Sequence, residues 1–229
     1  MNNIIILTTL LFFFCAVEGF SLDYSKEKNR MIEEQIISRG VNDKNVISAM
    51  QKVERHLFVP DNLRQQAYED GPLPIGYGQT ISQPYIVAYM TEALELKPED
   101  IVLEIGTGSG YQAAVLAEIV KQVYTIELLR PLADGARERL KKSGYSNIEV
   151  KQGDGYLGWP EHAPFDKIIV TAAPEDIPIK LIEQLKVGGK MILPVGSFYQ
   201  ELYLITKTDG GFIKKMLLPV RFVPMIKER

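Results

Sequence analysis

The sequence predicts an α/β fold in which helices pack on a doubly wound, mostly parallel sheet, and three observations support this class. Apolar runs of strand length recur at residues 101–105, 123–126, 148–152, 167–170 and 189–193. Helical patterns separate most of them, at residues 111–120, 131–144 and 176–186. The run beginning at Ile101 passes directly into a glycine-rich turn. Such alternation with short loops is typical of parallel sheets, whose ligands bind at the carboxyl ends of the strands.

The glycine-rich turn predicts a nucleotide-type ligand. Gly106, Gly108 and Gly110 stand at alternate positions, and glycine lets a backbone bend sharply and approach a ligand closely. The dinucleotide fingerprint differs, because here the third glycine comes one residue early and Glu104 precedes the first. A carboxylate at that place would repel a pyrophosphate but suits a cationic or hydroxyl-bearing ligand. The alternative is a purely structural turn between strand and helix.

Two further acidic residues follow strand ends. Glu127 ends the second strand about 20 residues after the glycines, where a ribose-binding acid is expected. Asp154, between Gly153 and Gly155, follows the third strand and can accept a hydrogen bond from an adenine amino group. An ordinary turn aspartate is the alternative there. Together, the E-x-G-x-G-x-G pattern and the strand-end glutamate resemble the binding site of S-adenosylmethionine methyltransferases.

Composition and the fourth strand disfavour action on nucleic acid. The net charge of -3 and the pI of about 5.6 argue against a broad basic face. The fourth strand is followed by Thr171-Ala172-Ala173-Pro174, which lacks the Asp/Asn-Pro-Pro-aromatic box of enzymes that methylate base amino groups. A chain of this length buries roughly 70% of its unfolded surface, so we expect no disulfide or structural metal to be needed.

The N-terminal part predicts packing helices and one functional loop. After Ser25, Met31, Ile32 and Ile36 at helical spacing predict a first helix that ends near Gly40. A second helix is expected after Asn42-Asp43 and a short one over 62–68, and His56 is expected to be a hydrogen-bonded core residue. Residues 70–84 are rich in glycine and proline and predict an irregular, functional loop. A helix follows from Pro84, so the structural interpretation of Ser82 is an N-cap. At the other end, residues 201–206 and 213–218 predict a hairpin.

The chain begins with a hydrophobic segment whose role is open. Residues 4–17 have the length of a signal-peptide core and are too short to span a bilayer. Against export, no Lys or Arg precedes them, and Phe14 before the only cysteine, Cys15, does not suit a lipoprotein box. We expect residues 1–19 to be a possible signal peptide and 20–229 to form a single domain, with N-terminal helices and loop over 20–95 and the α/β core over 96–229.

With these residues in view, the chain resembles the protein-L-isoaspartate O-methyltransferase family over about residues 31–229. The matching segments are 55–60, 78–84, 102–110, 153–155, 165–173, 185–196 and 220–224. The glycine motif is shared by many methyltransferases, whereas the Thr-Ile-Ser-Gln-Pro segment at 80–84 is much more specific. The resemblance implies a Rossmann-like methyltransferase fold with an N-terminal helical extension.

The resemblance also implies an activity and a set of site residues. The family methylates the free carboxylate of L-isoaspartyl and D-aspartyl residues in damaged proteins, with S-adenosylmethionine as cosubstrate and no metal. Ser82 is then the active-site residue, beside Thr80, Ile81, Gln83 and Arg221 of the substrate region. The residues expected to face the cosubstrate are Glu104, Gly106, Thr107, Gly108, Glu127, Asp154 and Gly155.

Three functional hypotheses remain at this stage. Isoaspartyl methyl transfer is the leading one; a methyltransferase acting on a small molecule and a non-catalytic nucleotide-binding module are the others. The leading one needs no general base, since a carboxylate of pKa near ~4 is already ionised at neutral pH. We expect isoaspartyl proteins as partners, a monomer, and neither nucleic acid nor stable membrane association. Supply of the cosubstrate favours the cytoplasm, and residues 1–19 favour the periplasm or secretion as the alternative.

Overall fold

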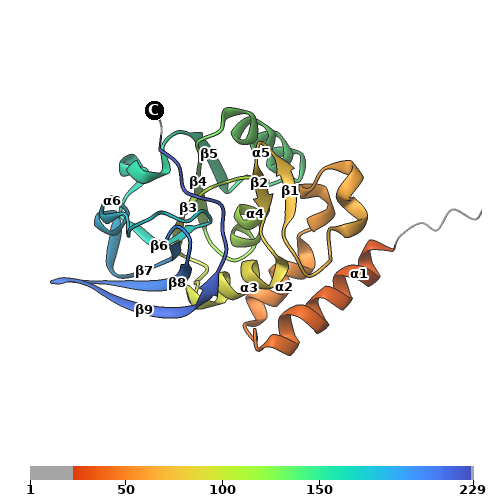
Figure 1. The fold of residues 1–229 in the computed structure, drawn as a ribbon, viewed down its shortest axis with the longest axis horizontal. Coiled ribbons are helices and arrows are strands. Elements are labelled where there is room, and N and C mark those ends of the chain that lie inside the picture. Colours follow the sequence, from red (N-terminus) through yellow and green to blue (C-terminus); the bar gives the residue numbers. More distant parts are fainter. Residues whose placement is uncertain (1–22, 228–229) are drawn as a thin grey trace, which may run out of the picture.

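A computed structural model describes residues 23–227 and contains a seven-stranded sheet in the order β5-β4-β3-β6-β7-β8-β9 (Figure 1). The predicted signal segment 1–19 lies outside the described residues. The strands are β3 (Ile101–Ile105), β4 (Gln122–Glu127), β5 (Ile148–Gln152), β6 (Phe165–Val170), β7 (Leu185–Val195), β8 (Gln200–Thr208) and β9 (Gly211–Val220). The pairs from β5 to β7 are parallel, and β7-β8-β9 is antiparallel. The doubly wound, mostly parallel sheet predicted from the sequence is confirmed.

The sheet order places a ligand site at the carboxyl end of β3. The chain moves outward from β3 to β4 and β5, and then returns to pair β6 with the other side of β3. Val102 pairs with both Val123 and Lys167, so β3 is hydrogen-bonded on both edges. A crevice forms at such a reversal of strand order, outside the carboxyl ends of the strands.

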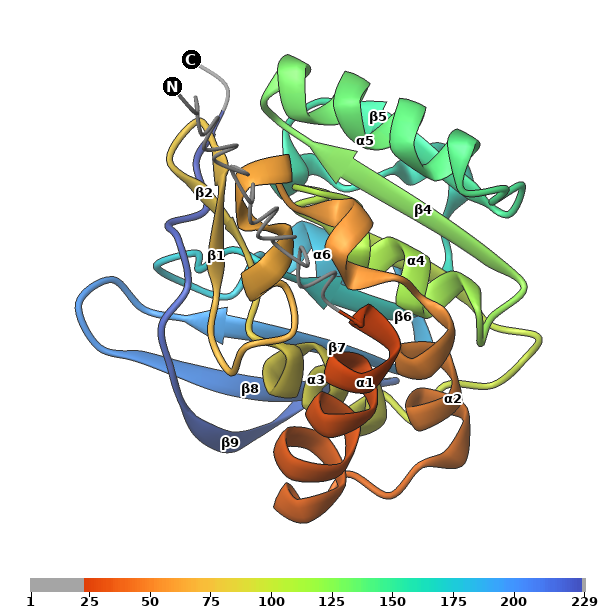
Figure 2. The same cartoon turned by 90° about the vertical axis from the view of Figure 1, so that its right-hand side faces the viewer.

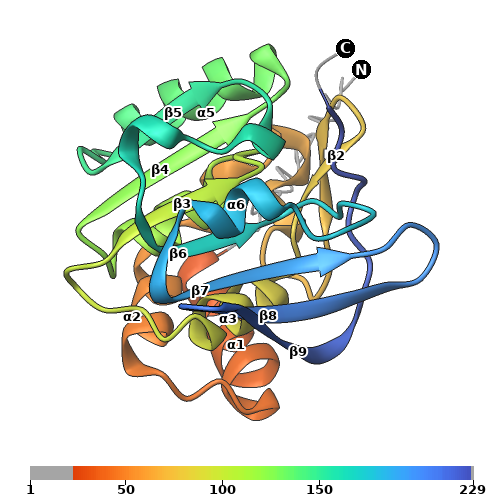
Figure 3. The same cartoon turned by 90° about the vertical axis from the view of Figure 1, so that its left-hand side faces the viewer.

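Two apolar clusters cover the two faces of the sheet. On one face, Val102 and Ile169 pack against the helices α1 (Tyr24–Met31), α2 (Lys44–Lys52), α3 (Pro84–Ala93), α4 (Tyr111–Ala117) and α5 (Arg130–Lys142) (Figure 2). On the other face, Leu103 and Ile168 pack against Trp159 and the short helix α6 (Ile179–Glu183) (Figure 3). Alternate β3 residues enter opposite clusters, as the two-residue period of a strand requires.

The N-terminal helices are those predicted, with one elaboration. Helix α1 continues through a π-helical turn (Ile32–Ile36) and a 3-10 turn (Ile37–Arg39), and ends at Gly40, whose φ is 93°. Asp43 caps α2 by accepting from the backbone N–H groups of Asn45 and Val46. Two 3-10 helices follow, over Arg55–Phe58 and Asp61–Gln66. Within residues 23–227, no helix is both long and apolar enough to cross a bilayer.

The prediction of an irregular loop over 70–84 was wrong in its centre. Residues Leu73–Gly76 (β1) and Gln79–Ile81 (β2) form an antiparallel pair, joined at Tyr77 and Gly78, which both have positive φ. Strands of four and three residues are too short to show an alternating pattern, and Pro74 disguises the first. The capping interpretation of Ser82 was also wrong, because Gln83 is the N-cap of α3 and no side chain caps it.

Several element boundaries differ from the predicted ones after the glycine turn, most clearly those of α6 and β7. Helix α6 begins only after Pro178 and ends at Glu183, well inside the predicted 176–186. Strand β7 starts at Leu185 rather than 189, because it runs through Gly188 and Gly189 with an irregularity in its register against β6. Gly188 and Gly189 were expected to interrupt a strand but lie inside β7, and Pro178 directly precedes α6. The final hairpin, β8 with β9, is confirmed.

Candidate active site

The glycine turn lies against the end of β6 with no room for side chains. Gly106, Gly108 and Gly110 have φ of 98°, 53° and 88°, values that favour glycine. A Cβ on Gly106 would stand 2.5 Å from Thr171 Oγ1. The Thr171 hydroxyl donates to the Gly106 carbonyl at 2.7 Å, so β6 holds the turn in place. The turn is a rigid backbone surface, as a closely bound ligand requires.

Glu127 occupies the position predicted for a ribose-binding acid. One carboxylate oxygen accepts from the N–H of Gly108 at 2.8 Å, and the other accepts from the N–H of Leu129 at 3.0 Å. The side chain is almost fully buried and lines a cavity that also touches Gly106 and Gly108. Each oxygen keeps a second lone pair, so the carboxylate can accept from two neighbouring hydroxyl groups.

We call this space the cofactor cavity. It is lined by Gln79, Thr80, Ile105, Gly106, Gly108, Ile126, Glu127, Leu128, Leu129, Gly155, Thr171, Ala172, Val223, Pro224, Met225 and Ile226. The segment after β9 runs back to the cofactor cavity and supplies the last four of these lining residues (Figure 1). Polar groups on Glu127 and the glycine turn face apolar groups from Leu128, Leu129 and Met225. That combination suits a nucleoside, with a hydroxyl-bearing sugar and an apolar, planar base.

Gly155 closes one side of the cofactor cavity. A Cβ there would stand 2.3 Å from Ile105 Cγ2 and 3.2 Å from Met225 Cε. Asp154, its neighbour, accepts a hydrogen bond from the N–H of Tyr156 at 2.8 Å and caps the 3-10 turn Gly155–Leu157. Asp154 does not line the cavity, and its side-chain hydrogen bond to the Tyr156 N–H is the one expected of an aspartate in a turn.

Two other predicted residues lie beneath the turn rather than in the cavity. Glu104 is fully buried and accepts a hydrogen bond from the Thr125 hydroxyl at 2.5 Å. The hydroxyls of Thr125 and Thr107 are 2.6 Å apart, so the three side chains form a buried chain. Burial raises the pKa of Glu104 to about 8, against the opposing effect of the Thr125 hydrogen bond and aided by the nearby Glu127.

These buried hydrogen bonds change the role expected for Glu104 from the sequence. A pKa of about 8 leaves this acid protonated at neutral pH, so it does not act as the fixed negative charge expected beside the turn. Its second oxygen, Oε1, is buried and has no hydrogen-bond partner among residues 23–227.

A second cavity, which we call the substrate cavity, adjoins the first. Its lining residues are Pro72, Thr80, Ser82, Gln83, Ile86, Thr171, Pro219, Val220, Arg221, Phe222 and Val223. Thr80, Thr171 and Val223 line both cavities, so the two spaces meet at these side chains. The structure therefore brings Ser82 and Arg221 together, although they are far apart in the sequence.

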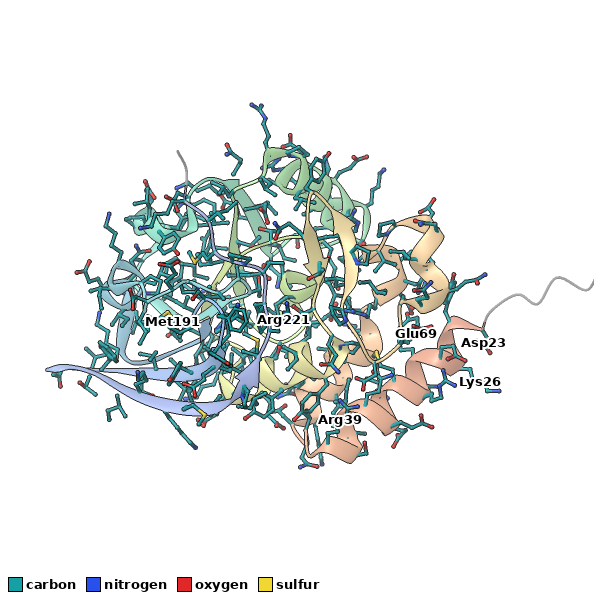
Figure 4. All side chains as sticks on the ribbon, viewed as in Figure 1. Asp23, Lys26, Arg39, Glu69, Met191 and Arg221 are labelled. Atoms are coloured by element: carbon teal, nitrogen blue, oxygen red, sulfur yellow. The ribbon has the colours of Figure 1, made fainter. Side chains whose placement is uncertain are left out.

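The substrate cavity is framed by anchored segments. Gln83 Nε2 donates to Asp70 Oδ1 at 2.7 Å, and Asp70 also pairs with Arg39. The side chain of Gln200 donates to the Phe222 carbonyl at 3.1 Å and accepts from its N–H, which holds the chain beside the exposed Arg221 where it leaves β9 (Figure 4). Among the residues predicted for the substrate region, Ile81 lies elsewhere, since its side chain is in the apolar core and lines neither cavity.

Sequence reasoning missed several lining residues. Leu128, Leu129, Met225 and Ile226 are apolar residues outside any motif, and only their position after a strand could have indicated them. His56 behaves as predicted: Nδ1 lies 2.8 Å from the Tyr68 hydroxyl and the ring stacks on Tyr24, away from both cavities. No metal-ligand group of His, Cys, Asp and Glu side chains occurs within residues 23–227.

The Rossmann-like sheet, the glycine turn with its strand-end glutamate, and the pair of joined cavities define an S-adenosylmethionine-dependent methyltransferase. Within that class, the chain belongs to the protein-L-isoaspartate(D-aspartate) O-methyltransferase family, whose model matches residues 26–229. The resemblance noted in the sequence is thereby confirmed.

Individual relatives agree with this assignment. A protein-L-isoaspartate O-methyltransferase of Synechococcus sp. is 56% identical over 211 residues, which cover 89% of this chain and 86% of the relative. One of Opitutus terrae is 53% identical over 226 residues, covering 98% and 97%. Among solved structures, a putative protein-L-isoaspartate O-methyltransferase of Plasmodium falciparum, in complex with S-adenosyl-L-homocysteine, is 26% identical with a TM-score of 0.76, covering 90% of this chain and 99% of that one.

Proposed function

We propose that this enzyme transfers the methyl group of S-adenosylmethionine to the free carboxylate of L-isoaspartyl and D-aspartyl residues in damaged proteins, with Ser82 orienting that carboxylate. The observation that carries the proposal is the meeting of the two cavities at Thr80, Thr171 and Val223. A carboxylate beside Ser82 and a methyl donor beside Glu127 would therefore approach each other across a shared boundary.

The cofactor cavity supplies binding and orientation. S-adenosylmethionine, when bound, supplies an activated methyl group on a sulfonium centre. Glu127 accepts hydrogen bonds from the ribose hydroxyls, and the turn at Gly106 and Gly108 allows close backbone approach. Leu128 and Leu129 offer apolar surface for the base. Glu104 and Thr107 support the glycine turn from beneath through Thr125, and Asp154 holds the backbone of the neighbouring turn at Gly155.

The substrate cavity supplies position and charge. The Ser82 hydroxyl donates to one oxygen of the substrate carboxylate, and the Arg221 guanidinium attracts the anion. Thr80 and Gln83 complete the polar lining, while Ile81 anchors the segment in the core. No base is required, because a carboxylic acid of pKa about 4 is ionised at neutral pH. Holding the reacting oxygen in line with the methyl group contributes up to roughly 7 to 11 kcal/mol.

An isoaspartyl peptide assayed beside its normal aspartyl twin tests the proposal. With radiolabelled S-adenosylmethionine, we expect base-labile methyl ester on the isoaspartyl peptide alone. Label on neither peptide, with adenosylhomocysteine still bound, would instead favour the alternative of a methyltransferase acting on a small molecule. Binding of adenosylhomocysteine by calorimetry keeps an inactive preparation from being mistaken for the wrong substrate.

We also infer how the enzyme works in its host: as a cytoplasmic monomer of one methyltransferase domain over residues 20–229. Supply of the cosubstrate supports the compartment, and the protein substrate requires neither nucleic acid nor a membrane. The hydrophobic residues 4–17 argue the other way. Intact-mass measurement of the protein from its own host decides between the two, because a chain that begins near Phe20 would contradict the cytoplasmic assignment.

A further inference from the structure

Arg55 is a fully buried cation that neither cavity includes. It begins the 3-10 helix Arg55–Phe58, and its side chain is 0% exposed. Burial lowers the pKa of its guanidinium to about 10, so the group keeps its charge at neutral pH. Among residues 23–227, no carboxylate lies within salt-bridge distance of it, and Nη1 has no hydrogen-bond partner. A charge buried without an ion-pair partner is costly, so its contacts call for an explanation.

The contacts of Arg55 include the segment that carries Ser82 and the helix that follows the glycine turn. Nη2 donates to the backbone carbonyl of Ser82 at 2.7 Å, and Nε donates to the carbonyl of Ala67 at 2.7 Å. The guanidinium carbon lies 4.9 Å from the centre of the Tyr111 ring. Tyr111 is the first residue of α4, the helix that follows the glycine turn. One planar group therefore joins the Ser82 segment to the helix that carries the cofactor turn.

The bond to Ser82 constrains the reacting group directly. A hydrogen bond to the Ser82 carbonyl fixes the plane of the peptide between Ser82 and Gln83. That plane sets the direction of the Ser82 Cα–Cβ bond, and so the place of the hydroxyl in the substrate cavity. The guanidinium is a rigid fork with several donors, and it reaches both carbonyls at once, which a lysine ammonium on a flexible stem cannot reproduce.

From this arrangement we infer that Arg55 is a positioning residue for methyl transfer, which holds the Ser82 segment in register with the cofactor turn without touching either substrate. The inference rests on the proposed role of Ser82. A positioning residue can be told from a residue that only stabilises the fold. Misplacing Ser82 relative to the cofactor turn should lower turnover more than it lowers cofactor affinity.

Arg55→Lys is the first test, because it keeps the charge and most of the volume. We expect a folded enzyme that binds adenosylhomocysteine with an affinity within about threefold of wild type. We expect kcat for isoaspartyl peptide to fall by about tenfold or more, with a smaller change in KM, since a small misplacement of a reacting group has large effects. Unchanged kcat in folded Arg55→Lys enzyme would overturn the inference.

Arg139→Lys is the matched control. Arg139 Nη1 also donates to a backbone carbonyl, that of Ser109 in the glycine turn, at 2.7 Å. This substitution removes the same kind of bond on the cofactor side only, so we expect weaker adenosylhomocysteine binding than in wild type and a smaller loss of kcat at saturating cosubstrate than in Arg55→Lys. Loss of cofactor affinity in Arg55→Lys equal to that in Arg139→Lys would mean that Arg55 serves the cofactor turn, and would also overturn the inference.

A double-mutant cycle with Ser82→Ala separates this inference from the proposed function. If Arg55 acts through Ser82, Arg55→Lys should cost about tenfold in the wild-type background and less than about threefold in Ser82→Ala, because residues acting as one unit are not additive. Equal costs in both backgrounds would refute Arg55 as a positioning residue while leaving Ser82 in place. Full activity of Ser82→Ala alone would refute the proposed role of Ser82 and, with it, this inference.

Discussion

The backbone N–H of Gly108 donates to the carboxylate of Glu127 across 2.8 Å, so the glycine turn and the end of β4 are joined directly. The bond links two sequence signals that were recognised separately, the glycine motif and the strand-end acid. It also orients the carboxylate, because the Leu129 N–H fixes its other oxygen at 3.0 Å. Glu127 is thus pre-arranged to accept further hydrogen bonds on its cavity side.

We expect Glu127→Ala to weaken binding of adenosylhomocysteine by about tenfold or more, because hydrogen bonds to a charged group contribute ~1.5 to 3 kcal/mol each. Isothermal calorimetry measures this directly. Glu149→Ala serves as the control, since that carboxylate is exposed on β5 and lines neither cavity. An unchanged affinity in Glu127→Ala would remove Glu127 from the cofactor site.

Gly155→Ala tests the shape of the cofactor cavity. The new Cβ would stand 2.3 Å from Ile105 Cγ2, so Ile105 or the turn must move. Such overpacking costs about 1 to 3 kcal/mol. We expect Gly155→Ala to lower the free energy of unfolding, to weaken cofactor binding, or to do both. Gly153→Ala is the matched control two residues away, where the nearest atom to a new Cβ is Lys151 Cε at 3.9 Å. Equal effects of the two substitutions in thermal unfolding and calorimetry would contradict the steric argument.

The sequence predicted the parts of the site that are encoded locally. Glycines at alternate positions and an acid at a strand end are short patterns with a direct physical meaning, and both lie in the cofactor cavity. The loop containing Ser82 was located by its glycine and proline content, but the role of Ser82 came from the resemblance to a family, and the short strands of the loop carry no periodic signal. Glu104 was predicted to face the cosubstrate but lies beneath the turn, and its raised pKa comes from burial in the core, which residue spacing does not reveal.

Contacts between distant segments could not be predicted in this way. Arg55 meets the Ser82 carbonyl across 27 positions of the chain, and nothing in its local pattern indicates a buried charge. The segment Val223 to Ile226 reaches the cofactor cavity only because β9 returns along β8 to the same edge of the sheet. Those placements depend on tertiary packing, which residue spacing does not contain.

Glu104→Gln should change the pH dependence of stability in the cofactor-free enzyme. The folded-state pKa is about 8, whereas an unfolded glutamate titrates near ~4.3, so the folded state holds one more proton between these values. The contribution of Glu104 to the free energy of unfolding therefore falls as pH rises through this window and levels off above about 8. Glutamine does not titrate, so the free energy of unfolding of Glu104→Gln relative to that of wild type should rise by about 2 to 5 kcal/mol between pH 5 and pH 8.

Urea unfolding of the two proteins at a series of pH values measures that difference. Glu149→Gln provides the comparison, because it makes the same substitution at an exposed carboxylate on β5. Parallel pH curves for Glu104→Gln and wild type would show that Glu104 is ionised in the folded protein, and would return it to the role of a fixed negative charge beneath the turn.

Ser82→Ala is the most direct test of the active-site assignment, because the structure removes the competing explanation for this residue. Gln83 is the N-cap of α3 and no side chain caps the helix, so deleting the hydroxyl should change the free energy of unfolding by less than about 0.5 kcal/mol. The lost hydrogen bond to a charged substrate is worth ~1.5 to 3 kcal/mol, which corresponds to a fall in kcat/KM of roughly 10- to 150-fold.

The cofactor affinity of Ser82→Ala should stay near wild type, since Ser82 lines the substrate cavity and not the cofactor cavity. Ser82→Gly extends the test, because it lacks the same hydroxyl and should show the same loss of turnover. Steady-state kinetics with isoaspartyl peptide, together with calorimetry and thermal unfolding of each variant, separate these effects. Wild-type kcat/KM in either folded variant would show that the Ser82 hydroxyl takes no part in orienting the substrate carboxylate.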